Sequence, residues 1–114
     1  MIDPAGFAEN LALRKESARR TLRTVSSEEL RALVGELFPD MVHPFYETFS
    51  KFIEEHRSET AVRGETSDGI AFVYYPRSNR GIWYTHTGKS LSVGLLGTTS
   101  LKALSEITAE AGFF

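Results

Sequence analysis

The triplet Gly88-Lys89-Ser90 is the best match in this chain to a motif that performs chemistry. In a phosphate-binding P-loop it closes the pattern Gly-x-x-x-x-Gly-Lys-Ser/Thr, which lies between a strand and a helix. The first glycine of that pattern would stand at position 83, which is Trp83, and the residues after Ser90 predict a strand. Without a helix N-terminus there is no row of free N–H groups for a phosphate. We therefore interpret the triplet as part of a hairpin.

A second candidate is a pocket that contains His86. The register predicted below places His86 near Asp68, across a hairpin, and puts aromatic residues on the same face. A His–Asp pair at the mouth of an apolar pocket can transfer protons, whereas a locally hydrogen-bonded histidine at a hairpin end is the simpler interpretation. The pocket, suited to a small apolar ligand, is predicted to be lined by Tyr74, Tyr84, His86, Phe52 and Asp68.

The sequence assigns no catalytic residue, metal site or cofactor. There are no cysteines, so disulfides, thiolate nucleophiles and cysteine-held metal centres are excluded. His43 and Glu47 have a spacing found in metal sites, but two ligands do not make one. We expect a protein that is not an enzyme and carries no cofactor.

Composition indicates one compact globular domain over residues 1–114. Hydrophobic residues make up 41% of the chain and charged residues 25%, and the net charge is −2. No apolar run approaches the roughly 18 residues of a membrane span, and the first residues lack the pattern of a secretory signal. We therefore expect a cytoplasmic protein that does not interact with membranes.

Apolar periodicity predicts three N-terminal helices and one C-terminal helix. The first covers residues 4–23, the second starts after the cap Ser26 and stops at Pro39, the third covers residues 44–57 and the fourth residues 100–111. Ser26 and Glu29 form the pattern of a capping box. Thr99 is the expected cap of the last helix, and Gly112 is placed for a left-handed C-terminal cap.

Four strands are predicted between these helices, over residues 60–64, 70–75, 81–86 and 90–96. Short connections favour an antiparallel meander, so we expect an α+β fold with the helices mainly on one sheet face. A two-residue turn at Thr87-Gly88 would pair Tyr84 with Leu91, and a loop over residues 76–80 would pair Tyr74 with Ile82.

This register divides the sheet into a core face and a second face that the helices leave open. Trp83 lies at the centre of the second face, among small and hydroxyl side chains, which is typical of a contact site. Packing of Trp83 against its own neighbours is the alternative. The predicted binding surface consists of Trp83, Tyr75, Val73, Thr85, Arg63 and Ser92.

Three functions follow from these observations. The leading hypothesis is a non-enzymatic intracellular binding or regulatory protein that acts through the Trp83 face, by forming a homodimer or by binding another protein. The second is a small-molecule-binding protein or enzyme that uses the Tyr/His pocket. The third is nucleic-acid binding through the arginine-rich face of the first helix. This hypothesis is less favoured, because Glu16 can pair with Arg19 and Arg20 on that face.

Overall fold

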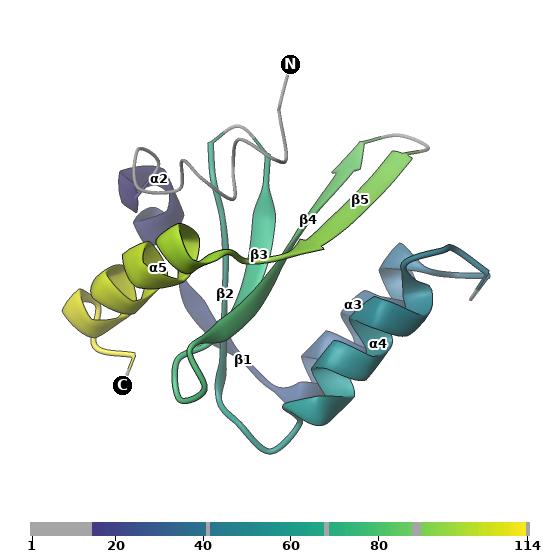
Figure 1. The fold of residues 1–114 in the computed structure, drawn as a ribbon, viewed down its shortest axis with the longest axis horizontal. Helices are drawn as coiled ribbons and strands as arrows, with labels where there is room; N and C mark the ends of the chain where they lie inside the picture. The colour runs from purple at the N-terminus through teal and green to yellow at the C-terminus, as the bar shows by residue number, and fades with distance from the viewer. Residues whose placement is uncertain (1–14, 41, 68, 88–89, 114) are drawn as a thin grey trace.

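The fold is α+β, with one antiparallel five-stranded sheet in the order β1-β2-β3-β4-β5. The computed structural model describes residues 15–40, 42–67, 69–87 and 90–113. Its elements, shown in Figure 1, are α2 (Lys15–Arg20), β1 (Arg23–Val25), α3 (Ser27–Leu37), α4 (Tyr46–Glu55), β2 (Ala61–Glu65), β3 (Ala71–Tyr75), β4 (Arg80–Thr87), β5 (Ser90–Leu95) and α5 (Thr98–Glu110). The expected class and the antiparallel meander are confirmed.

Strand β1 corrects the expected extent of the first helix. Helix α2 ends at Arg20, and the predicted part of that helix before residue 15 lies outside the described residues. The Thr21 hydroxyl donates to the backbone oxygen of Ala18 and is also within hydrogen-bond distance of the backbone of Glu65 on β2. This side chain therefore ends the helix and holds the chain beside β2, where residues 23–25 pair as a fifth strand.

The helix caps agree in part with the sequence prediction. Ser26 caps α3 by accepting a hydrogen bond from the backbone N–H of Glu29 at 3.1 Å. Helix α5 starts earlier than expected, with Gly97 rather than Thr99 at the N-cap. Gly112 has a φ of +80°, and the N–H of Phe113 donates to the backbone oxygen of Thr108, so the left-handed C-terminal cap is confirmed.

The register between β3 and β4 differs by one residue from the prediction. Tyr74 pairs with Gly81 and Tyr75 with Arg80, so the connecting loop has four residues instead of five. Because side chains alternate along a strand, this shift moves all of β4 to the opposite face relative to β3. Between β4 and β5, Tyr84 pairs with Val93 rather than Leu91, a shift of two residues that preserves the predicted faces of these two strands.

Helices cover both faces of the sheet, which corrects the expectation that one face stays open. Figure 1 shows α2 and α5 on one side of the sheet and α3 and α4 on the other. The two hydrophobic clusters agree with this arrangement. One joins α3 and α4 to Val73, Tyr75, Ile82 and Tyr84, and the other joins α2 and α5 to Ile70, Phe72, Tyr74 and Trp83.

Close packing of Trp83 on Gly94 makes the first testable prediction. A Cβ at Gly94 would lie 2.6 Å from the rigid Trp83 ring, so Gly94→Ala forces the sheet or the ring to move. We expect a loss of about 1–3 kcal/mol in the free energy of unfolding, measured by urea denaturation.

Gly35→Ala is the matched control for this substitution. A Cβ at Gly35 meets nothing within 4 Å, and the residue lies in α3. This change is expected to raise stability by about 0.5–1 kcal/mol, because alanine is favoured over glycine in a helix. Equal effects of the two substitutions would contradict the packing described here.

Candidate functional site

The centre of the predicted binding surface is buried. Trp83 is 9% exposed and belongs to the cluster under α5, together with Leu104 and Ile107. Val73 and Tyr75 are fully buried on the opposite face, against α3 and α4. The expectation that these residues share an open face is wrong, because the one-residue change in register separates Trp83 from the other two.

The remaining residues of that surface, which lie on β2, β4 and β5, are partly exposed or half-buried. Thr85 pairs with Ser92 between β4 and β5, and both are half-buried. Arg63 is half-buried on β2, directly opposite Arg23 of β1. Their part in binding stays a prediction; by the alternation of side chains, Thr85 and Ser92 lie on the same face as Trp83, whereas Arg63 lies on the opposite face, beside Val73.

The predicted Tyr/His pocket is not assembled as one site. Tyr74 and Tyr84 lie on opposite faces of the sheet, again because of the β3–β4 register. Tyr74 Oη donates to Asn79 Oδ1 at 2.7 Å, within the adjacent loop, and Phe52 packs on Tyr75. Residue 68 and the side chain of His86 lie outside the described part of the structure.

His56 is a buried histidine at the C-terminal end of α4. Its Nδ1 lies 2.6 Å from Glu59 Oε2, and since a carboxylate only accepts, Nδ1 carries the proton. Glu59 also accepts a hydrogen bond from the Ser78 hydroxyl. The His56 ring stacks on Tyr75 at 4.6 Å, and His56 Nε2 and Tyr75 Oη have no hydrogen-bond partner among the described residues. The His56–Glu59 pair, through the hydrogen bond from Ser78, connects the end of α4 to the β3–β4 loop.

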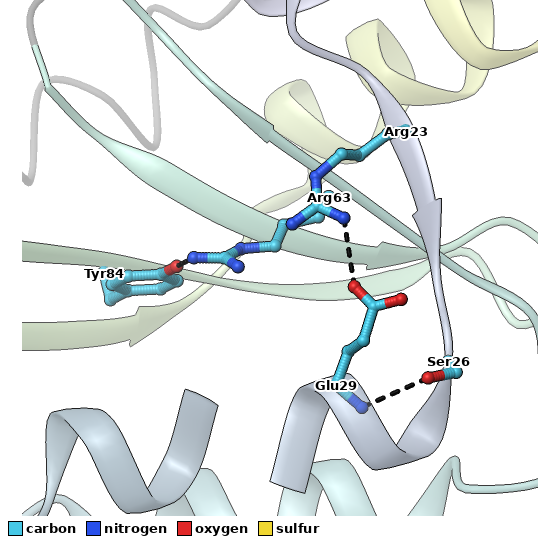
Figure 2. Close-up of polar contacts among 5 residues, drawn as sticks. All are labelled: Arg23, Ser26, Glu29, Arg63 and Tyr84. Carbon is cyan, nitrogen blue, oxygen red and sulfur yellow. Dashed lines mark hydrogen bonds and ion pairs between the residues drawn. The ribbon is translucent and has the colours of Figure 1, made fainter. Parts of the chain in front are cut away.

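The most distinctive polar contact joins Arg63 to Tyr84 across the sheet (Figure 2). Arg63 donates to Tyr84 Oη, and its guanidinium lies 5.9 Å from the centre of the tyrosine ring. Burial raises the pKa of Tyr84, which the charge and hydrogen bond of Arg63 partly oppose. Arg23, the cross-strand neighbour of Arg63, is paired with Glu29 at 3.0 Å. The sequence did not indicate the contact between Arg63 and Tyr84, because these two residues are 21 positions apart.

Strand β5 forms an open edge of the sheet. The backbone N–H of Leu96 donates to the carbonyl oxygen of Gly81 at 3.0 Å. Antiparallel pairing alternates, so the N–H and C=O groups of residues 90, 92 and 94 point toward β4 and those of Leu91, Val93 and Leu95 point away from it. No hydrogen bond joins the backbone of these three residues to any other described residue. Six residues long, this edge can accept another strand.

The side chains around the β5 edge add an apolar contact. Leu95 is 56% exposed, although its cross-strand partner Ile82 is fully buried. It lines a shallow groove of about 660 Å³ together with Phe52 and Arg80. The strand itself carries no charged residue. Natural edge strands are commonly protected by charges or proline, and β5 has neither.

Two basic residues near the first predicted helix, Arg19 and Arg23, are paired with carboxylates, whereas no ion pair joins Arg20 to Glu16 or to any other described residue. Arg19 is paired with Glu16 at 3.8 Å and with Glu110 at 3.3 Å, and Arg23 is paired with Glu29. The side chains of residues 14 and 15 lie outside the described part. Nothing in the described ranges therefore strengthens the nucleic-acid hypothesis.

The described residues contain neither a candidate metal site nor a candidate membrane-spanning helix. No group of three or more histidine, aspartate or glutamate side chains is placed to hold a metal ion within the described ranges. None of the helices described has both the length and the apolar character of a membrane span.

The fold and the candidate sites together define a small α+β protein whose antiparallel sheet is covered on both faces and open along β5. Comparison with protein-family models, with curated proteins and with solved structures finds no match for this chain.

The His56–Glu59 pair is expected to make the stability of the fold depend on pH. Burial raises the pKa of Glu59, but hydrogen bonds from Ser78 and His56 and the charges of His56 and Arg77 lower it by more, so the pKa is below its usual value. A carboxyl with a lowered pKa in the folded state stabilises the fold above its unfolded pKa, and this contribution is lost as the pH falls through the folded value. Glu59→Gln should therefore lower the free energy of unfolding by about 1–3 kcal/mol at pH 7.

The difference between wild type and Glu59→Gln should shrink as the pH falls below the ordinary pKa of a glutamate, about 4.3, and should be lost once the pH has fallen through the lowered pKa of folded Glu59. Urea denaturation across a pH series measures both. Glu55→Gln is the control. The Glu55 side chain is 64% exposed and forms a long ion pair of 3.9 Å with Arg80, and an exposed pair of this kind contributes less than about 1 kcal/mol. A Glu59→Gln difference that is independent of pH would contradict the assignment.

Proposed function

We propose that this chain is a non-enzymatic binding protein that acts by pairing its β5 edge with a strand of another chain, in the first place a second copy of itself. The observation that carries the proposal is the outward row of backbone groups at Leu91, Val93 and Leu95. Strand addition at an open edge is a common mode of protein recognition, because the main-chain hydrogen bonds supply affinity. The partner surface is therefore an edge rather than the Trp83 face expected from the sequence.

A second copy suits this edge because β5 is compatible with its own sequence in antiparallel pairing. With Val93 on a two-fold axis, its N–H and C=O bond to those of Val93 of the partner subunit. Leu95 then lies opposite Leu91 of the partner subunit, so the exposed Leu95 gains an apolar neighbour. Because β5 carries no charge, no like charges are opposed. Dimers with two-fold symmetry are the commonest homo-oligomers.

Trp83 has an indirect part in this proposal. Its ring packs against Gly94 of β5 from the α5 side of the sheet. This contact fixes the position of the edge strand while Leu95 remains exposed on the opposite face. The aromatic residue that the sequence singled out would thus support the interface without touching the partner.

The other sheet edge is a weaker candidate. Strand β1 has only three residues, and Arg23, one of them, is already paired with Glu29. Short edges limit the number of hydrogen bonds that a partner strand can form. Strand β5 is therefore the better edge for pairing with a partner strand.

Light scattering coupled to size exclusion tests the proposal. Wild type is expected to run at twice the chain mass, and Leu95→Lys should weaken association at least about tenfold, because a loss of about 1.4 kcal/mol has that effect. Val42→Lys is the control, since Val42 is 82% exposed and lies outside the sheet; its association should equal that of wild type.

Val93→Pro is a second variant that separates the edge from the fold. The N–H of Val93 points away from β4, so proline removes a hydrogen bond to the partner and none within the sheet. We expect a folded monomer, with unfolding in urea still cooperative. The proposal fails if wild type has the mass of one chain up to about 1 mM, where an association of about 4 kcal/mol would be visible, or if neither variant weakens association.

A further inference from the structure

A small polar pocket lies toward the edge of the sheet opposite β5, over β1, β2 and β3. Its volume is about 230 Å³, and its lining includes Arg23, Arg63, Glu65 and Ala71. Ala71 pairs with Glu65 on one side and with Tyr84 on the other. Because its side chain is a single methyl group, space remains beside the path that Arg63 follows to the tyrosine (Figure 2).

Among the described residues of the pocket lining, Arg63 is the arginine without a carboxylate partner. Arg63 is half-buried, and no carboxylate of the described residues lies within 4 Å of its guanidinium, whereas Arg23 is held by Glu29 at 3.0 Å. Arg23 and Arg63 lie directly opposite one another on neighbouring strands, where two like charges are destabilising, and Glu29 offsets the charge of Arg23. A bound anion would offset the charge of Arg63 in the same way.

Tyr84 prepares the guanidinium for binding. Its hydroxyl accepts one hydrogen bond from Arg63 Nη2, which fixes the orientation of the planar group and leaves its other N–H donors available. Burial raises the pKa of Tyr84, so the phenol stays neutral and does not compete as a negative charge. The ring is itself held in place by Phe49 of α4, at 5.8 Å. An oriented guanidinium loses less freedom when it binds a ligand.

The surrounding charges favour an anion with a single negative charge. Glu65 lines the same pocket, and Glu29 already neutralises Arg23. Among the described residues no carboxylate lies within 4 Å of Arg63, so a ligand can contact its guanidinium directly, and Glu65 in the same lining would repel a doubly charged phosphate more strongly than a singly charged carboxylate. The planar fork of arginine matches a carboxylate, which it binds through two parallel hydrogen bonds.

We propose that Arg63 binds the carboxylate of a small, singly charged organic acid in the pocket that Ala71 leaves open. This site is independent of the β5 edge, because its lining residues come from β1, β2, β3 and the turn before β1. The protein would thus have a ligand site in addition to its strand-pairing edge.

The test follows the side-chain Nε–H signal of Arg63 in ¹H–¹⁵N spectra during titration. The probes are acetate, benzoate and inorganic phosphate, each compared with sodium chloride at the same ionic strength. At least one of the two carboxylates should move the signal to saturation, and phosphate should do no more than chloride. No saturable shift with either carboxylate, or a larger saturable shift with phosphate, overturns the proposal.

Two variants distinguish the pocket from a general effect of charge. Ala71→Leu fills the space beside Arg63 and should abolish the saturable shift. Arg63→Lys, in which binding is monitored by the backbone amide signals around the pocket, should weaken binding at least about tenfold, because lysine lacks the planar fork of arginine. Arg57→Gln is the control, since the Arg57 side chain is 67% exposed and lies on the α4 side of the groove. Unchanged affinity in both Ala71→Leu and Arg63→Lys would also overturn the proposal.

Discussion

The arrangement of β4 and β5 depends on the short loop that joins β3 to β4. Tyr75 pairs with Arg80, and Asn79 closes the four-residue loop with a φ of 52°, a left-handed conformation that asparagine adopts more readily than most residues. Tyr74, from the strand itself, holds Asn79 through a hydrogen bond of 2.7 Å. A loop one residue longer would exchange the faces of Trp83 and Tyr84.

This register gives the sheet two apolar faces, and each of them needs a helical layer. Trp83 joins Phe72 and Tyr74 on the face toward α5, while Tyr84 joins Val73 and Tyr75 on the face toward α3 and α4. Every residue of β3 is buried. With both faces covered, the backbone of β5 that points away from β4 is the part of the sheet best placed to bind another strand.

Local signals in the sequence predicted the parts of the fold that depend on neighbouring residues. The cap at Ser26 and the left-handed Gly112 were both identifiable, because each depends on a few adjacent side chains. Strand β1 was missed, since three residues become a strand only by pairing with a segment about 40 positions away. The run Ala71–Tyr75, apolar throughout, was the signal for a strand covered on both faces.

The candidate sites were less predictable, because each depends on register. Arg63 was expected at a binding surface and Tyr84 in a pocket, and the structure brings them together through a hydrogen bond that neither expectation contained. Tyr84 also pairs with Val93, the residue at the centre of the β5 edge. The arginine pocket and the open edge thus approach the same tyrosine from opposite sides. Since the pocket lining ends at β3, a strand added to β5 would leave the pocket open.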